Sequence, residues 1–188
     1  MTLNLRNLAF VGSLAPRAVW NARTDLAASL AAGATNPNGR WRYGRKTPSL
    51  VFSQLSSFNG SGWFGNSSFN TPLIYVATGD ALDSHVPVGS ADEVSLRWTA
   101  PSAMTISIDV SVSKSTTGGD GVLFTLRTTS NVVLNSSGVI HGPSGLHNYF
   151  NPSLVVASGQ VLDFDVSRNG TDAFDNFRYE RVIISQIS

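Results

Sequence analysis

The sequence contains no cysteine among its 188 residues. Disulfide bonds, thiolate metal sites and cysteine nucleophiles are therefore excluded. Charged residues make up only 13% of the chain, about half the fraction of an average globular protein, which argues against a coiled coil and against disorder driven by charge. No apolar run approaches the roughly 20 residues with which a helix crosses a bilayer. Serine, threonine, asparagine and glycine fill the polar positions, as is typical of a turn-rich folded protein.

Signatures of catalysis are also scarce. Glu93 and Glu180 are the only glutamates, and the chain has no G-x-S-x-G nucleophile elbow, phosphate loop or dinucleotide fingerprint. Asp163 and Asp165 share one strand face, and glycosidases use such carboxylate pairs, but acids on the solvated face of a sheet explain them more simply. The three histidines match no compact metal motif: His85, His141 and His147. We expect a protein that is not an enzyme.

Alternating apolar residues mark most of the chain as β-structure. Within 105–112, four β-branched residues share one face, and 162–166 repeats the pattern with both aspartates on the other face. The expected strands cover 41–43, 50–55, 73–77, 94–99, 104–112, 121–128, 132–134, 154–156, 161–167 and 179–187. Turn residues separate them roughly every 8–12 positions, as in sandwiches and barrels. The predicted fold is all-β, an antiparallel jelly-roll β-sandwich.

The first 39 residues differ from the rest. We divide the chain into 1–39, a basic N-terminal arm with a short helix, and 40–188, the jelly-roll sandwich. Asn21 or Thr24 can cap a helix over 25–32, which Gly33 would end. A short alanine-rich helix is marginal alone, so we expect it to pack on another part of the protein.

Charge is split along the chain. Residues 1–46 carry seven basic residues and one acidic residue, a net charge of +6, whereas 47–188 carry six basic and eleven acidic residues, a net charge of −5. The arginines expected to anchor the arm are Arg6, Arg17, Arg23, Arg40, Arg42 and Arg45. This asymmetry indicates either docking on an acidic partner or an arm that covers its own acidic domain. Aromatics alternate with cations over 40–46, but the bias does not extend over a larger face, and nucleic acid is not the expected partner.

Several segments together resemble a recurring bacterial jelly-roll module, similar to the galactose-binding-like sandwiches of carbohydrate-binding modules. The segments that carry the resemblance are LRWTAPS (96–102), TISI (105–108), GGDGV (118–122) and the stretch 155–166, and RWTAP and GDGV are the most specific of them. Further matches are the W-x-Y of Trp41 and Tyr43, a middle tryptophan at Trp63, and the pair His85 and Pro87, split here by Val86. The resemblance covers roughly residues 40–188.

Modules of this kind occur in secreted surface proteins with a C-terminal sorting tail and in virus-related proteins. Here the sorting tail is absent, and the apolar stretch 8–15 is broken by Gly12 and Ser13, so a secretory signal is not expected. The resemblance therefore implies a virion structural component, a capsid decoration or tail-associated protein made in the host cytoplasm and displayed on the virion surface. Its partners would be capsid or other virion proteins bound through the basic arm, and by analogy it would be a trimer. The alternative is an adhesion module that binds cell-surface polysaccharide.

A sugar site needs an aromatic face for the pyranose ring and planar polar groups for its hydroxyls. The glycine-rich stretch 58–69 supplies both kinds, and so does the loop near 150. The predicted glycan contacts are Trp63, Phe64, Asn66, Tyr149 and Asn151. For Trp63 the alternative is packing across the open end of the sandwich. Trp98 is expected in the core.

A structural Ca²⁺ ion is the one cofactor considered. Asp120, Asp172 and Asp175 offer the hard oxygen ligands that calcium prefers. They are scattered, however, and no dense D-x-D-x-D loop exists. The alternative is that Asp120 bonds its own backbone in the tight turn 118–121.

Overall fold

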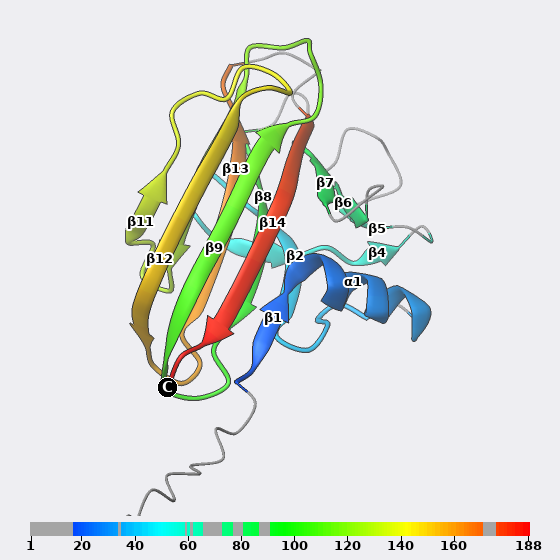
Figure 1. Cartoon of the computed structure of the whole chain (residues 1–188). Coiled ribbons are helices and arrows are strands. Elements are labelled where there is room, and N and C mark those ends of the chain that lie inside the picture. Colours follow the sequence, from blue (N-terminus) through cyan, green and yellow to red (C-terminus); the bar gives the residue numbers. More distant parts are fainter. Residues whose placement is uncertain are drawn as a thin grey trace, which may run out of the picture.

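The computed structural model describes residues 17–33, 35–58, 60, 62–65, 73–76, 81–86, 91–170 and 176–188. In these residues two antiparallel sheets face one another, with a single short helix beside them (Figure 1). The expected all-β jelly-roll sandwich is confirmed. Within the described residues, no helix combines the length and the apolar character needed to span a membrane.

The larger sheet has eight strands. Its order is β12-β9-β14-β7-β6-β5-β4, and β1 pairs with β14 beside that path. The bounds are β1 (Val19–Asn21), β4 (Ser57–Phe58), β5 (Gly62–Phe64), β6 (Leu73–Val76), β7 (Leu82–His85), β9 (Met104–Lys114), β12 (Leu146–Val156) and β14 (Asn176–Gln186). Strand β12 therefore forms one edge of this sheet.

The smaller sheet has six strands in the order β11-β10-β13-β8-β2-β3. The bounds are β2 (Trp41–Lys46), β3 (Phe52–Gln54), β8 (Glu93–Thr99), β10 (Val122–Thr128), β11 (Val133–Ser136) and β13 (Val161–Arg168). Successive strands from β8 onward cross repeatedly between the two sheets, as the jelly-roll arrangement requires.

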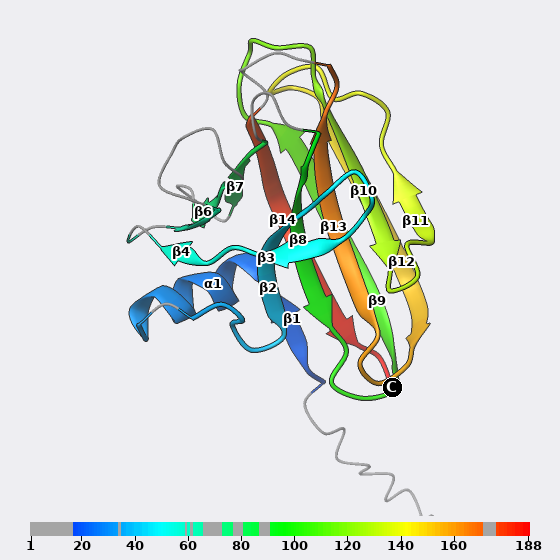
Figure 2. The same ribbon diagram turned by 180° about the vertical axis from the view of Figure 1, so that it is seen from behind.

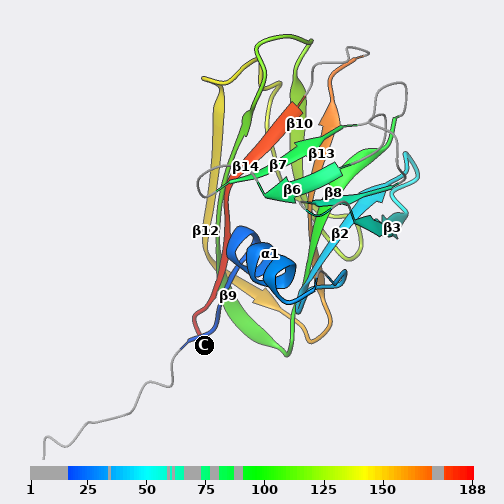
Figure 3. The ribbon, with the colours of Figure 1, turned by 90° about the vertical axis from the view of Figure 1, so that its right-hand side faces the viewer.

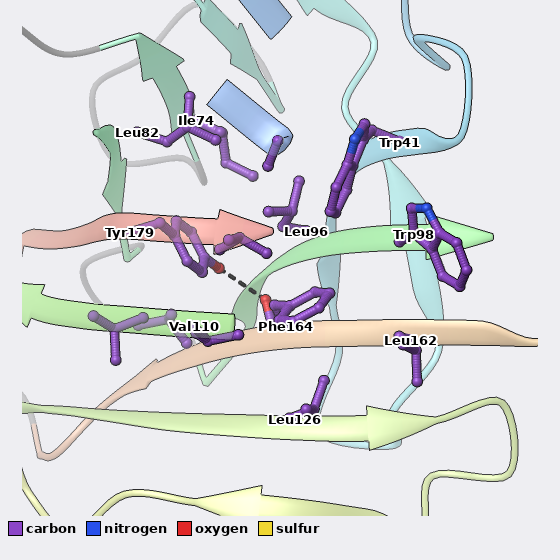
Figure 4. Packing of buried hydrophobic residues seen from close by; sticks show 14 of the residues in the cluster. Trp41, Ile74, Leu82, Leu96, Trp98, Val110, Leu126, Leu162, Phe164 and Tyr179 are labelled. Atoms are coloured by element: carbon purple, nitrogen blue, oxygen red, sulfur yellow. Dashed lines mark hydrogen bonds between the residues drawn. The ribbon is translucent and has the colours of Figure 1, made fainter. Parts of the chain in front are cut away.

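The core lies between the inner faces of the sheets (Figure 4). The strict alternation of β9 places Ile106, Ile108 and Val110 there with no exposed surface. Trp98 is fully buried, as expected from the sequence. The hydroxyl of Tyr179 on β14 donates a hydrogen bond to the carbonyl of Phe164 on β13 at 2.8 Å. This bond links the two sheets inside the core.

Helix α1 (Ala22–Ala31) lies between the two sheets on the open side of the sandwich (Figure 3). Asn21 caps it by accepting from the backbone N–H groups of Arg23 and Thr24, both at 3.1 Å. Leu26 is fully buried in the core, and the carboxylate of Asp25 accepts from the indole Nε1 of Trp41 at 2.7 Å. The described part of the arm thus adds a strand and a helix to the sandwich, while the boundary at residue 39 stays a prediction.

Candidate functional site

Strands β12, β9 and β14 lie side by side on the outer side of the eight-stranded sheet, and no described element lies across them in this view (Figure 1). The pairing register defines which residues are neighbours there. Phe150 lies opposite Asp109, and Asn148 lies opposite Ser111, which in turn lies opposite Arg181. Because residues opposite one another in a sheet share a face, these side chains form one cluster. We call this cluster, Phe150, Asn148, Asp109, Ser111 and Arg181, the sheet platform.

The platform includes a largely exposed aromatic ring. Phe150 has 65% of its surface in water, whereas aromatic side chains such as Trp98 and Phe164 on other strands are fully buried. Burial of apolar surface stabilises a protein by about 25 cal/mol per Å², and the exposed part of this ring does not contribute that stabilisation. Packing within the described residues therefore leaves most of the Phe150 ring uncovered.

Planar polar groups surround the ring. The guanidinium of Arg181 binds Asp109 through two contacts, Nε to Oδ2 at 2.8 Å and Nη2 to Oδ1 at 2.9 Å. Both side chains remain about half exposed, at 46% and 37%. Farther along the same face, the hydroxyl of Ser113 donates to Oε1 of Glu180 at 2.6 Å. Carboxylates and guanidinium groups of this kind offer several further hydrogen-bonding sites to a polyhydroxylated ligand.

A second polar row follows on the same outer face toward β6. Arg178 binds Asp83 through Nε at 2.6 Å and Nη2 at 3.0 Å, and the hydroxyl of Tyr75 lies 3.4 Å from the same carboxylate. Hydrogen bonding to Asp83 raises the pKa of Arg178, and burial together with this carboxylate raises the pKa of Tyr75. Arg178 therefore stays cationic and Tyr75 stays neutral at physiological pH.

The predicted glycan contacts lie in two separate places. Trp63 on β5 is 7% exposed and its ring packs 5.3 Å from that of Phe58, as the packing alternative expected. Phe64 is half-buried beside it, and Asn66 lies outside the described residues. Strands β5 and β12 are far apart in the sheet order, so the described members of the set do not meet in one site.

The other two predicted contacts lie on β12 but face the core. Tyr149 and Asn151 lie opposite Val110 and Ile108, whose side chains point inward, and Asn151 donates to the hydroxyl of Tyr149 at 3.2 Å. Phe150, between them, points outward and was missed. The alternation of strand β12 places Phe150 outward, but the sequence analysis expected a strand only over 154–156 and so assigned no direction to this side chain.

The proposed calcium ligands cannot be assembled from the described residues. Asp120 lies in the turn between β9 and β10, where Gly119 and Gly121 have φ values of 84° and 106°. Asp172 and Asp175 fall outside the described residues. Within the part of the chain that is described, no group of three His, Asp or Glu side chains is placed to hold a metal ion. A calcium site stays a prediction.

The arginines assigned to the arm have different surroundings. Arg17 and Arg40 are exposed, Arg23 is partly buried, and Arg6 lies outside the described residues. Arg42 donates to the hydroxyl of Thr99 at 3.0 Å, and Arg45 pairs with Asp92 at 3.1 Å. The last two contacts favour, at those positions, the alternative in which basic residues bind the acidic domain of the same chain.

The expectation that Asp163 and Asp165 are solvated is wrong. Each is 1% exposed, and the ammonium of Lys46 lies 2.7 Å from the first and 3.0 Å from the second. Arg97 pairs with Asp163 at 2.6 Å, and Arg127 bridges Asp165 at 2.5 Å and Glu93 at 3.0 Å. The β2–β3 hairpin crosses this outer face of the smaller sheet and covers the cluster (Figure 2).

Burial and ion pairs together set the protonation of these carboxylates. Burial raises the pKa of Asp165 and of Glu93, while Lys46 opposes the shift at Asp165 and Arg127 opposes it at Glu93. Three cations face three carboxylates, so the cluster is balanced in charge. A pair held in this way, under a hairpin, does not resemble the two carboxylates that flank a glycosidic bond in a hydrolase.

The chain was compared with known proteins. No family model matches it, and no curated protein matches it. Among solved structures it is similar to a family 51 carbohydrate-binding module from Clostridium perfringens in complex with methyl-galactose, with 9% identity, a TM-score of 0.41, and coverage of 79% of this chain and 81% of that one.

Two further solved structures are similar to the chain at comparably low identity and TM-score. A family 36 carbohydrate-binding module in complex with calcium and xylotriose shares 16% identity at a TM-score of 0.36, over 67% of this chain and 93% of that one. The enzymatically active domain of tailspike protein 4 from bacteriophage CBA120 shares 11% identity at a TM-score of 0.39, over 79% of this chain and 20% of that one. All three are similarities of fold at low identity.

Proposed function

We propose that this protein is a non-catalytic carbohydrate-binding β-sandwich whose glycan lies on the sheet platform. The observation that carries the proposal is the exposed ring of Phe150, with 65% of its surface in water, beside Asn148, Asp109 and Arg181. A flat aromatic ring can stack on the C–H face of a pyranose. The planar amide, carboxylate and guanidinium groups can then bind pairs of hydroxyls around its rim.

Binding without turnover is supported by the surroundings of the acids. Asp109 is held by Arg181 and Glu180 by Ser113, and the side chains of the first pair are 37% and 46% exposed to water. Glycoside hydrolysis needs one carboxyl group with a raised pKa and a second carboxylate placed across the scissile bond. Burial raises the pKa of three acids away from the platform: Glu93 and Asp165 lie in the other sheet, within ion pairs, and Asp25 lies on helix α1, where it accepts from Trp41.

The test is a binding measurement with one substitution. The wild-type chain is screened against a panel of soluble plant, algal and bacterial polysaccharides, and affinity for the best ligand is measured by calorimetry. Phe150→Ala should weaken binding by about tenfold or more, the equivalent of about 1.4 kcal/mol. The matched control is Val133→Ala, which changes a 53% exposed apolar side chain on β11 of the other sheet and should leave affinity unchanged.

Two results would overturn the proposal. One is that the wild-type chain binds no polysaccharide in the panel. The other is that Phe150→Ala and Val133→Ala bind the ligand equally well, which would place any site away from the platform. Unfolding curves for both variants establish that a loss of binding is not a loss of fold.

A second candidate function is the virion-surface role expected from the sequence. The charge split supports it, because Arg17 and Arg40 are exposed and can meet an acidic partner. Density-gradient fractionation of the source lysate, with mass spectrometry, tests it. Migration with DNA-filled particles at a fixed ratio to their main shell protein is the expected result, and a chain confined to the soluble or cell-surface fraction would contradict it. Size-exclusion chromatography with light scattering tests the trimer.

A further inference from the structure

A pocket lies at the start of β12. Its volume is about 390 Å³, at the small end of the usual range for ligand pockets. It is lined by Ser137, Gly138, Val139, Ile140, His141, Gly145, Leu146 and His147. The lining therefore combines apolar side chains, an exposed imidazole at His141 and the backbone of two glycines.

Leu146 belongs to both the pocket and the outer face of the sheet. It lies opposite Ser113, in the same strand phase as Asn148 and Phe150, and is 56% exposed. Four residues of β-strand span about 13 Å, so Leu146 and Phe150 are the two ends of one straight row along β12. This distance exceeds the size of a single pyranose ring.

The row has a regular chemistry. Leu146 and Phe150 are apolar and exposed, and Asn148 between them is polar and exposed. Strand β12 contains no Asp, Glu, Lys or Arg along its whole length. Ser113, Ser111 and Asp109 flank the row on β9, and the charge of Asp109 is balanced by its ion pair with Arg181. Apolar surfaces spaced along a strand with an amide between them suit a chain of neutral sugar rings, each with a C–H face and a rim of hydroxyls.

We propose that the ligand of the sheet platform is a neutral linear oligosaccharide that runs along β12, with one ring over Phe150 and its far end in the pocket beside Leu146 and His141. The inference rests on the function proposed above and adds the length and direction of the ligand. A metal ion is not the occupant argued for, because no group of three His, Asp or Glu side chains among the described residues is placed to hold one.

Gly138 allows the pocket to be filled selectively. A Cβ built at this position meets no atom within 4 Å, and φ lies outside the left-handed region, so a side chain can be added here without backbone strain. Gly138→Leu should therefore occupy the pocket while leaving Phe150 untouched. The matched control is Ala103→Leu, which adds the same side chain at an exposed turn between β8 and β9.

The experiment measures affinity against chain length. Mono-, di-, tri- and tetrasaccharides of the polysaccharide identified by the panel are titrated into the wild type, Gly138→Leu and Ala103→Leu. For the wild type and Ala103→Leu, affinity should rise about tenfold or more between the disaccharide and the tetrasaccharide. For Gly138→Leu this rise should disappear while the disaccharide affinity stays the same. His141→Ala provides a second, milder variant with a smaller loss confined to the longer ligands.

Each outcome separates the two proposals. Wild-type affinity that does not depend on length, or Gly138→Leu and His141→Ala variants that both retain the full rise, would overturn the extended ligand. If Phe150→Ala still abolishes binding in that case, the platform stands and only its extension fails. If Phe150→Ala has no effect, the proposed function fails, and the length inference fails with it.

Discussion

The guanidinium of Arg97 lies over the ring of Phe52, with its central carbon 3.9 Å from the ring centroid. The same guanidinium donates to both oxygens of Asp163, from Nε at 2.6 Å and from Nη2 at 2.9 Å. Phe52 is the first residue of β3, so the cation–π contact fastens the β2–β3 hairpin over the buried ion pairs. A hairpin and a charge cluster therefore stabilise one another on the outer face of the smaller sheet.

Gly44 leaves room for the ring of Phe52. A Cβ at this position would lie 2.3 Å from two ring carbons and 2.7 Å from the backbone oxygen of Ser53. Gly44→Ala should therefore destabilise the protein by about 1–3 kcal/mol, as overpacking does. Alanine usually stabilises a strand relative to glycine, so the sign is informative. Urea unfolding measures it, with Gly138→Ala as the control in open space, and a gain in stability for Gly44→Ala would contradict the packing.

Lys46 is the buried cation between two carboxylates. Lys46→Met keeps most of the side-chain volume but leaves Asp163 and Asp165 with one cation fewer, and should cost about 3–5 kcal/mol of unfolding free energy. Arg45→Met is the neighbouring control. Its ion pair with Asp92 is 45% exposed on the arginine side and should contribute less than about 1 kcal/mol. Equal effects for the two variants would show that the cluster is not buried as described.

Leu26 tests whether the helix of the arm is part of the core. Its side chain has no exposed surface, so Leu26→Ala should lower the unfolding free energy by about 2–5 kcal/mol. Val19→Ala changes a 59% exposed side chain on the adjacent strand β1 and should cost less than about 0.5 kcal/mol. Thermal or urea unfolding distinguishes them. A helix that only touches the sandwich would make both variants nearly neutral.

His147 makes stability depend on pH. Burial lowers its pKa below the unfolded value, its Nε2 lies 2.7 Å from Oδ1 of Asn135, and its ring lies 5.9 Å from that of Phe124. Below about pH 6.5 the unfolded chain therefore binds more protons than the folded one, so stability present above that pH is lost on acidification. His147→Gln should show a smaller loss between pH 7.5 and 5.5.

The urea midpoint at several pH values measures this effect. Burial also lowers the pKa of His85, so part of the acid loss should remain in the His147→Gln variant. An identical dependence on pH in the wild type and the variant would contradict the prediction.

Strands with unbroken alternation were predictable. The residues of β9 from Ile106 to Val112 alternate strictly, and the apolar ones have no exposed surface. Leu162, Phe164 and Val166 on β13 behave in the same way. In these segments the alternation of apolar residues in the sequence predicts which side chains are buried. The reason is that each strand has one face on the core and pairs with its neighbours in regular register.

The platform was hidden by an interruption in β12. Only 154–156 was expected as a strand, whereas β12 begins at Leu146. Pro152 and a shift of register between Asn151 and Leu154 break the alternation, and both are tolerated because β12 is an edge strand. The sequence analysis therefore placed Tyr149 and Asn151 in a loop near residue 150, and it did not assign Phe150 to a strand face.

The burial of Asp163 and Asp165 depends on distant residues. The prediction that both point to the face of β13 away from Phe164 is confirmed. They are shielded from water by the β2–β3 hairpin, which contains Lys46 and lies more than a hundred positions earlier in the chain. The local sequence of β13 does not indicate that another segment shields these carboxylates from water. Pairing between remote charges is a property of the assembled sheet.

The position of β14 has a consequence for how the chain folds as it is synthesised. Strands β7, β6, β5 and β4 join β9 and β12 only through β14, and β1 pairs with β14 as well, across more than 160 positions. A nascent chain that has not reached residues 176–186 holds two unconnected parts of the larger sheet, with the inner row of β9 uncovered on that side. Completion of the sandwich follows the translation of its central strand, and until then the apolar rows next to β14 lack that neighbour and stay open to non-native contacts.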